Sequence, residues 1–299
     1  MWKELLQQIQ LGNVKSLARA ISFIENEQPG YSEFLQSLNS SNANIIGITG
    51  PPGAGKSTLV DAFIGLLVNS GKKVAVLCVD PSSPFNLGAL LGDRIRMSEW
   101  YTHPNVFIRS LATRGSMGGL HPKIIEITDL LKAAKFDTII IETVGVGQSE
   151  IEIAGLADIT VVVVVPEAGD EVQTMKAGLM EIADVFVVNK SDRPGADLFV
   201  KNLRLMLAPA FHSHANEIPI IKTVATEKKG IDELMAAIQL HNGAAAPNEK
   251  RAWLLTEKAW QLIVNKKMKD LTKEKIREMI SEKANQPNFN LYSFIDQFQ

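Results

Sequence analysis

Apolar residues in this chain fall into two patterns, namely unbroken runs and positions that recur at helical spacing. Seven runs of six or seven mainly apolar residues are rich in Val and Ile, which is typical of strands buried on both faces of a parallel sheet. The intervening segments 121–134, 170–182 and 230–240 show helical periodicity. This alternation predicts an α/β fold with a doubly wound, mainly parallel sheet and ligand-binding loops at the carboxyl ends of its strands. The predicted strands are 44–49, 73–79, 106–111, 137–142, 159–165, 184–189 and 218–224.

Both ends of the chain follow helical rather than strand patterns. Leu and Ile recur at helical spacing in the first forty residues, and the lysine-rich segment 248–285 is amphipathic. The apolar side of that segment includes Trp253 and Trp260, and it must pack on the core domain or on a second copy of the chain. We therefore expect an N-terminal helical extension at 1–41, a central domain at 42–242 and a C-terminal helical extension, a candidate dimerisation arm, at 243–299.

Composition excludes several classes of protein. The 299 residues carry a formal net charge of −2, so no overall field favours nucleic acid or an anionic membrane. One cysteine, Cys78, cannot form a disulfide within the chain and suits a reducing compartment. The N-terminus does not resemble a signal peptide, and the longest apolar run, 159–165, is too short to span a bilayer. We expect a cytoplasmic protein with neither nucleic-acid nor membrane partners.

The most specific motif is at residues 50–58, which read Gly-Pro-Pro-Gly-Ala-Gly-Lys-Ser-Thr and match the phosphate-binding loop G-x-x-x-x-G-K-[ST]. It lies between a predicted strand and a predicted helix. Glycines let the backbone approach phosphate oxygens, and amides at the helix N-terminus point at the anion. Lys56 would face the β- and γ-phosphates, and the Ser57 hydroxyl would bind Mg²⁺. The candidates for binding the nucleotide here are Gly53, Ala54, Gly55, Lys56, Ser57 and Thr58.

A second motif, Asn-Lys-Ser-Asp at 189–192, follows a predicted strand and matches the N-K-x-D motif by which GTPases recognise guanine. The Asp192 carboxylate can accept hydrogen bonds from N1–H and the exocyclic amine of guanine, a donor pair that adenine lacks. Asn189 could bridge to the base or brace the phosphate loop, and the Lys190 stem could cover the base. The guanine-binding candidates are Asn189, Lys190, Asp192 and, through a backbone amide, Val224 and Ala225.

Acidic residues near strand ends are candidates for holding Mg²⁺. Asp80 and Glu142 each follow or end a predicted strand, and Asp93 lies in the intervening loop, from which it could reach the γ-phosphate region. The predicted metal set is therefore Ser57, Asp80, Asp93 and Glu142.

Glu142 also begins a Glu-x-x-Gly pattern that ends at Gly145 and resembles the D-x-x-G element that senses a γ-phosphate. The Gly145 amide would bond that phosphate and release it on hydrolysis. No Gln directly follows Gly145, and Gln148 lies further on, so we expect slow intrinsic hydrolysis that a partner accelerates. The catalytic candidates are Lys56, Asp93, Glu142 and Gln148.

Taken together, these motifs resemble the MeaB/ArgK family of the SIMIBI class of P-loop GTPases. The Gly-Asp-Arg run at 92–94 and the Gly-Val-Gly-Gln-Ser-Glu run at 145–150 are the most specific features. The matching runs are 50–58, 79–83, 92–97, 142–150, 168–173, 189–192 and 223–226.

The resemblance implies a G-protein chaperone that binds GTP or GDP with Mg²⁺ and has helical extensions at both ends of its GTPase domain. Its partner would be an adenosylcobalamin-dependent acyl-CoA mutase of the methylmalonyl-CoA mutase type, with the cobalamin adenosyltransferase as a second candidate partner. The chaperone would gate cofactor loading and protect the mutase. The family also implies a homodimer and switch segments around Asp93, 142–148 and 169–176, although the residues of the loop 166–173 alone favour an ordinary loop.

Other functions stay open on the residues themselves. A metal-insertion GTPase of the same class, for example one for nickel, usually carries His-rich tails or Cys-x-Cys sites, and here His212 and His214 form the one close His pair. A small-molecule kinase or transport ATPase would have no use for the guanine motif at 189–192. A nucleotide-dependent binding clamp with vestigial hydrolysis would need only the binding residues.

Overall fold

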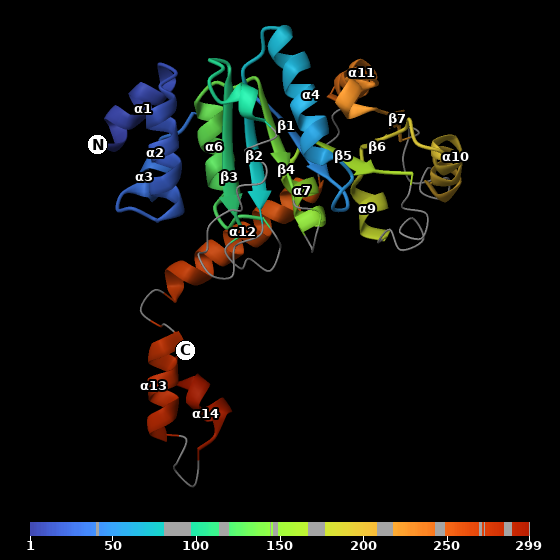
Figure 1. Cartoon of the computed structure of the whole chain (residues 1–299). Helices are drawn as coiled ribbons and strands as arrows, with labels where there is room; N and C mark the ends of the chain where they lie inside the picture. The colour runs from blue at the N-terminus through green and yellow to red at the C-terminus, as the bar shows by residue number, and fades with distance from the viewer. Residues whose placement is uncertain are drawn as a thin grey trace. The chain divides into compact units, whose positions relative to one another are not determined.

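The computed structural model of the chain describes residues 1–39, 42–80, 97–113, 120–143, 145, 149–166, 177–207, 218–242, 249–268, 271, 273–283 and 289–298. In these residues, seven parallel strands form one sheet in the order β3-β2-β4-β1-β5-β6-β7 (Figure 1). Strands β2, β3 and β4 lie on one side of β1, and β5, β6 and β7 lie on the other, which confirms the predicted doubly wound fold. The strands are β1 (Asn44–Thr49), β2 (Val74–Asp80), β3 (Val106–Ala112), β4 (Thr138–Glu142), β5 (Ile159–Val164), β6 (Val185–Val188) and β7 (Ile220–Lys222), all within two residues of the predicted bounds.

Helices cover both faces of the sheet because its strands are apolar on both sides. One face packs on α4 (Lys56–Asn69) and α11 (Ile231–Asn242), which share a buried cluster with alternate residues of β1, β5 and β6. The other face packs on α7 (Ser149–Leu156), α9 (Ala177–Ile182) and α10 (Ala196–Leu207). This two-sided burial explains why the strands read as continuous apolar runs rather than as alternating patterns.

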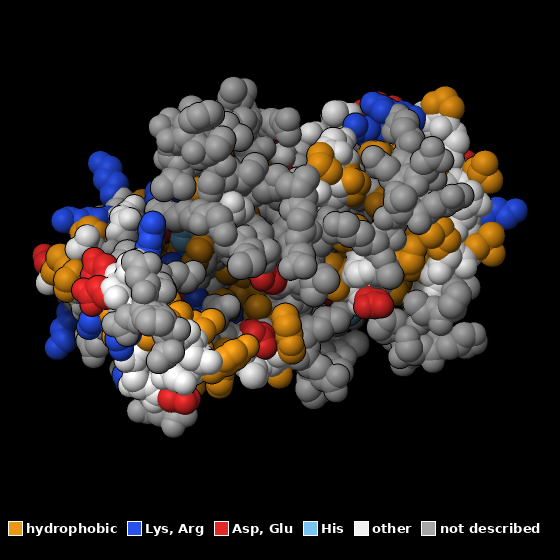
Figure 2. Space-filling model, turned by 90° about the horizontal axis from the view of Figure 1, so that it is seen from below, with side chains coloured by type: hydrophobic (Ala, Val, Ile, Leu, Met, Phe, Trp, Pro, Cys, Tyr) orange, Lys and Arg blue, Asp and Glu red, His pale blue; other side chains and the backbone are white. Residues whose placement is uncertain are grey.

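Helix α10 has a buried face and an apolar outer face. Phe199 and Leu203 pack into the core, whereas Leu198 and Leu205 are exposed. Figure 2 shows hydrophobic and basic side chains close together at its right-hand edge, the side on which α10 lies in Figure 1. A groove of about 470 Å³ runs along this helix. Its lining residues are Asp197, Val200, Lys201, Arg204 and Leu205 of α10 and Lys222 of β7. The helix therefore presents a mixed apolar and basic surface away from the sheet.

Three N-terminal helices form a layer beside the edge strand β3: α1 (Trp2–Gln10), α2 (Val14–Glu25) and α3 (Tyr31–Gln36). Asn13 caps α2 by accepting a hydrogen bond from the Ser16 amide at 3.0 Å. Helices α2 and α3 contact α6 (Ile124–Ala133), which in turn packs on β4. The layer belongs to the same compact unit as the sheet, Met1–Arg251.

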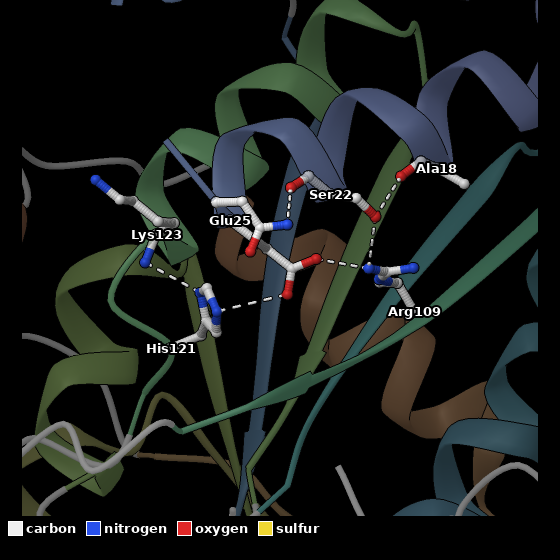
Figure 3. A network of polar contacts seen from close by, with 7 residues as sticks. Ala18, Ser22, Glu25, Arg109, His121 and Lys123 are labelled. Atoms are coloured by element: carbon white, nitrogen blue, oxygen red, sulfur yellow. Dashed lines mark hydrogen bonds and ion pairs between the residues drawn. The ribbon is translucent and has the colours of Figure 1, made fainter. Parts of the chain in front are cut away.

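A polar network joins this layer to the sheet (Figure 3). The Glu25 carboxylate accepts a hydrogen bond of 2.5 Å from Nη2 of Arg109 on β3, and its other oxygen lies 3.6 Å from His121 Nε2. Burial alone would lower the pKa of Lys123, but its hydrogen bond to Glu27 and the charge of Glu126 outweigh burial and raise that pKa. Charged groups thus hold α2 against β3 and the start of α6.

The C-terminal part of the chain forms a separate compact unit, Ala252–Gln299. It holds most of α12 (Glu249–Lys267), together with α13 (Lys273–Lys283) and α14 (Leu291–Asp296). Phe294 is its buried centre, with the rings of Phe289 and Phe298 and the ammonium of Lys283 around it. Among the described residues, no helix combines the length and the apolar character needed to cross a membrane.

Candidate functional site

The phosphate loop lies at the carboxyl edge of the sheet, between the end of β1 and the first turn of α4. Gly55 precedes α4 with a left-handed φ of 87°, and a Cβ at this position would overlap Nδ2 of Asn189. A larger residue would therefore have to displace the Asn189 side chain and adopt a left-handed backbone that favours glycine. The 14-residue helix α4 directs its first free amides into the loop, which gives this point a partial positive charge.

Lys56 lies inside the loop and is only 6% exposed. Its ammonium donates hydrogen bonds to the carbonyls of Gly50 at 2.9 Å and Pro51 at 3.1 Å. Gly145 packs against this ammonium and the Gly50 carbonyl. A Cβ at Gly145 would lie 2.7 Å from the Lys56 ammonium and would overlap the Gly50 carbonyl. The structure thus brings Lys56 and Gly145, predicted from separate motifs, to one point.

Ser57 and Glu142 meet at the start of α4. The Ser57 hydroxyl donates a hydrogen bond of 2.6 Å to Oε1 of Glu142, and both side chains are buried. Glu142 reaches Ser57 because it ends β4, which pairs with β1 in a register that sets Ile48 opposite Glu142. A hydroxyl and a carboxylate oxygen are ligands that Mg²⁺ accepts, usually with waters and substrate phosphates completing its shell. The donor set therefore fits this ion.

The motif at 189–192, predicted to recognise guanine, braces the phosphate loop. The Asn189 side chain donates from Nδ2 to the Ala54 carbonyl at 2.9 Å, and Lys190 donates from Nζ to the Gly53 carbonyl at 2.9 Å. Oδ1 of Asn189 accepts from the Thr223 hydroxyl at 3.1 Å and from the Ala225 amide at 3.2 Å. One buried amide thus connects the phosphate loop, the β6 end and the β7 end. Of the two roles considered for Asn189, the structure displays the bracing of the phosphate loop.

A cavity of about 160 Å³ lies beside these contacts. It is comparable to the engineered cavity of about 150 Å³ that admits benzene. The predicted guanine-binding residues Asn189, Lys190, Asp192, Val224 and Ala225 all line it, together with Gly55, Thr58, Arg193 and Thr226. A pocket with one exposed carboxylate and nearby backbone amides suits a flat heterocycle with several donors and acceptors.

Arg193 lines this cavity but was not among the residues predicted from the motifs. Arg193 follows Asp192 directly, so its position next to the motif was the available signal. The 3-10 helix η3 (Ala225–Glu227) follows Val224, and Lys229 lies just beyond it. A hydrogen bond from Lys229 to Glu227, together with the charge of Glu227, raises the pKa of the Lys229 ammonium, and Asp192 adds to this effect.

Some predicted site residues are not described. Asp93 and Gln148 lie outside the described residues, as do the implied switch segment at 169–176 and all but the first residue of the loop 166–173. The backbone of Asp80 ends β2 at the same edge, but its side chain is not described. Among the described residues, no group of three His, Cys, Asp or Glu side chains is placed to hold a metal. The roles of these residues stay predictions.

Comparisons with known proteins agree with this geometry. A family model described as "Methylmalonyl Co-A mutase-associated GTPase MeaB" matches residues 17–284. A protein of Pyrococcus horikoshii that carries a GTPase name is 48% identical over 243 residues, which cover 80% of this chain and 77% of that protein. GTPase ArgK of Escherichia coli is 37% identical over 246 residues, covering 79% and 74%. The crystal structure of a LAO/AO transport system kinase superposes with a TM-score of 0.69 at 26% identity, covering 99% and 96%.

Proposed function

We propose that this chain, which belongs to the MeaB family of P-loop GTPases, uses GTP to gate adenosylcobalamin loading into an acyl-CoA mutase and to protect that mutase. The observation that carries the nucleotide part is the contact between the phosphate loop and the base-recognition motif. Because Asn189 and Lys190 both donate to loop carbonyls, the phosphate and base positions have a fixed separation. The family description supports a mutase of the methylmalonyl-CoA mutase type as the client.

The phosphate loop would bind the triphosphate through the backbone amides of 53–58 and the Lys56 ammonium. Lys56 now donates to the carbonyls of Gly50 and Pro51, and it would transfer these hydrogen bonds to the β- and γ-phosphate oxygens. A buried ammonium in a loop of low dielectric interacts with phosphate far more strongly than an exposed one. Lys56 therefore provides most of the side-chain contribution to nucleotide affinity.

The cavity beside Asn189 would hold guanine. Asp192, which lines this cavity, would accept hydrogen bonds from N1–H and the exocyclic amine. The Ala225 amide now donates to Asn189 and the Val224 amide to the Lys229 carbonyl, so one of them would share or transfer its hydrogen bond to O6. The Lys190 stem would cover the base. Guanine selectivity then follows from matched donors and acceptors rather than from the size of the cavity.

Ser57 and Glu142 would hold Mg²⁺, with Asp80 and Asp93 as further candidates from the sequence. When bound, the ion supplies positive charge beside the β- and γ-phosphates and orients them. The 2.6 Å contact between Ser57 and Glu142 supports this assignment because it already places the two oxygen ligands next to each other.

Hydrolysis would be slow in the isolated protein. Gly145 lies against the Lys56 ammonium, where its amide would sense the γ-phosphate, and Gln148 and Asp93 are the candidates for orienting water and completing the charge. No Gln directly follows Gly145, so a partner would have to order these groups to accelerate the reaction. The mutase is the proposed partner, and the cobalamin adenosyltransferase is a second candidate.

We further propose that the protein is a cytoplasmic homodimer and that the C-terminal extension, 243–299, is its dimerisation arm. The rest of the chain would consist of the N-terminal helical extension, 1–41, and the GTPase domain, 42–242. The support is the exposure of Trp253 (55%) and Trp260 (65%) on α12. These residues are seven apart and so fall on one stripe of the helix. Large apolar side chains exposed together on one face often mark a surface that binds another protein chain.

The decisive experiment measures GTP hydrolysis by the full chain with and without an adenosylcobalamin-dependent acyl-CoA mutase from the same source. We expect a slow basal rate that the mutase raises by at least about tenfold. Lys56→Ala should lose GTP binding and both rates while it retains its fold, as followed by circular dichroism. Exposed Lys15 on α2, changed to Ala, is the matched control and should leave both rates unchanged.

An unchanged rate with the mutase would contradict the proposed client but not the GTPase activity. Metal insertion would then become the better hypothesis, and nickel binding by the purified chain would test it. GTP binding with no turnover under any condition would instead favour a nucleotide-dependent clamp. Normal GTP binding by Lys56→Ala would contradict the assignment of the phosphate loop.

A further inference from the structure

Two buried threonine hydroxyls are bonded to each other directly beneath the proposed nucleotide site. Thr49 is the last residue of β1, and Thr143 is the residue that follows β4. The Thr143 hydroxyl donates to the Thr49 hydroxyl at 2.8 Å, and the two residues are 1% and 0% exposed. Neither hydroxyl is part of the phosphate, base or metal contacts described above.

The position of the pair follows from the strand register. Ile48 lies opposite Glu142, the last residue of β4. The next residue, Thr143, donates from its amide to the Ile48 carbonyl at 3.0 Å. Successive side chains on a strand point to opposite faces. The Thr49–Thr143 pair therefore lies on the opposite face from Glu142, whose carboxylate meets Ser57.

The hydroxyl pair joins the starting points of two loops. Thr49 directly precedes Gly50, whose carbonyl accepts a hydrogen bond from Lys56. Thr143 lies two residues before Gly145, which packs against that same carbonyl. The paired register of β1 and β4 ends at Ile48 and Glu142. Beyond it, the hydrogen bond between the Thr49 and Thr143 hydroxyls links the two strand ends. A lost or shifted hydroxyl would let the two strand ends move relative to each other.

We infer that Thr49 and Thr143 are positioning residues that hold the Glu142 carboxylate against the Ser57 hydroxyl and so set the Mg²⁺ concentration that GTP hydrolysis requires. The inference rests on the proposed roles of Ser57 and Glu142. An apolar pair such as Val–Val would fill the same space, but it would not fix the separation of the strand ends, because packing contacts are not directional whereas hydrogen bonds are. The two hydroxyls thus act through Glu142 and not on the nucleotide itself.

The test compares Thr143→Val with Thr143→Ser in the full chain by two measurements: Mg²⁺ binding to the GDP-bound chain by calorimetry, and GTP hydrolysis as a function of Mg²⁺ concentration. Removing the hydroxyl should raise the half-saturating Mg²⁺ concentration about three- to tenfold, the equivalent of one ordinary hydrogen bond. At saturating Mg²⁺ the rate should return close to that of the wild type. Thr143→Ser keeps the hydroxyl and should restore the original Mg²⁺ requirement.

Two further variants keep the test informative. Thr49→Val removes the other partner and gives a second measurement if Thr143→Val folds poorly, as judged by thermal unfolding. The double variant should show less than the sum of the two single effects, because both remove one interaction. Thr128→Val is the matched control: Thr128 is 1% exposed and its hydroxyl donates to the Ile124 carbonyl at 2.7 Å within α6, away from the site.

An unchanged Mg²⁺ requirement in folded Thr143→Val and Thr49→Val would overturn the inference. An equal shift in Thr128→Val would also overturn it, because the effect would then reflect general destabilisation. Both results leave the proposed function standing as long as Lys56→Ala loses GTP binding. A wild-type chain whose GTP hydrolysis does not depend on Mg²⁺ would contradict the proposed metal site, and this inference with it.

Discussion

At the scale of single residues, the Asn189 side chain organises the candidate site. Its oxygen accepts from Thr223 and Ala225, and its nitrogen donates to Ala54, so three loops depend on one buried amide. Both acceptor positions of the oxygen are occupied by these contacts. We therefore expect base selectivity to depend on Asp192 rather than on Asn189.

Asp192→Asn should reduce the preference of the chain for GTP over ATP by at least about tenfold. The reason is that an amide offers one acceptor and one donor, whereas guanine requires two acceptors at this place. The same variant should gain affinity for xanthosine triphosphate, whose C2 carbonyl can accept from the new amide. Competition binding with the three nucleotides measures both effects.

Asp232→Asn is the matched control for this substitution, because Asp232 is an exposed carboxylate on α11. It should leave all three affinities unchanged. An Asp192→Asn chain with the wild-type order of nucleotide preference would remove Asp192 from base recognition.

At the scale of elements, the docking of α2 on β3 depends on charged groups rather than on apolar packing alone. Glu25 bonds Arg109, and its second oxygen faces the buried His121 ring. Removing one member of such a network leaves its partners buried with fewer contacts. Ser22 also accepts from Arg109 at 3.2 Å, so part of the network would remain.

Glu25→Gln should therefore lower the free energy of unfolding by about 1–3 kcal/mol, as measured by urea denaturation. Limited proteolysis should also cut the N-terminal helices earlier than in the wild type, since their attachment to β3 is weakened. Glu4→Gln, an exposed change on α1, is the control and should alter neither measurement. Equal stability of the Glu25→Gln chain would show that apolar contacts of α2 suffice.

At the scale of the whole molecule, the chain divides into two compact units, Met1–Arg251 and Ala252–Gln299. The first has a continuous core on both faces of the sheet. The second buries Phe294 but leaves the large side chains of α12 exposed. A unit with so small a core gains stability when a second copy covers its apolar surface.

Trp260→Glu should therefore shift the chain from dimer to monomer in light scattering coupled to size-exclusion chromatography. A charge buried in an apolar interface is costly, so dimerisation should weaken at least about tenfold. Basal GTP hydrolysis should persist because Trp260 lies outside the nucleotide site. The control is Glu257→Gln, an exposed change on the same helix. A wild-type chain that is monomeric at high concentration would contradict the dimer.

Local sequence patterns were enough to predict the strands, the fold class and the two motifs at 50–58 and 189–192. Apolar runs reveal strands buried on both faces, and the motifs at 50–58 and 189–192 are short enough to be read as continuous patterns. The role of Thr223 was not predicted, because its hydrogen bond to Asn189 leaves no local sequence pattern. Helix α10 was not predicted either, although its buried residues Phe199, Leu203 and Leu207 recur at helical spacing.

The contacts between these elements could be seen only in the folded chain. Ser57 and Glu142 are 85 positions apart, and Asn189 and Ala54 are 135 apart, yet each pair is in hydrogen-bond contact. The Thr49–Thr143 bond likewise exists because β4 pairs with β1, which the order of strands along the chain does not reveal. Local patterns specify elements, whereas the order of strands in the sheet decides which of their ends are neighbours.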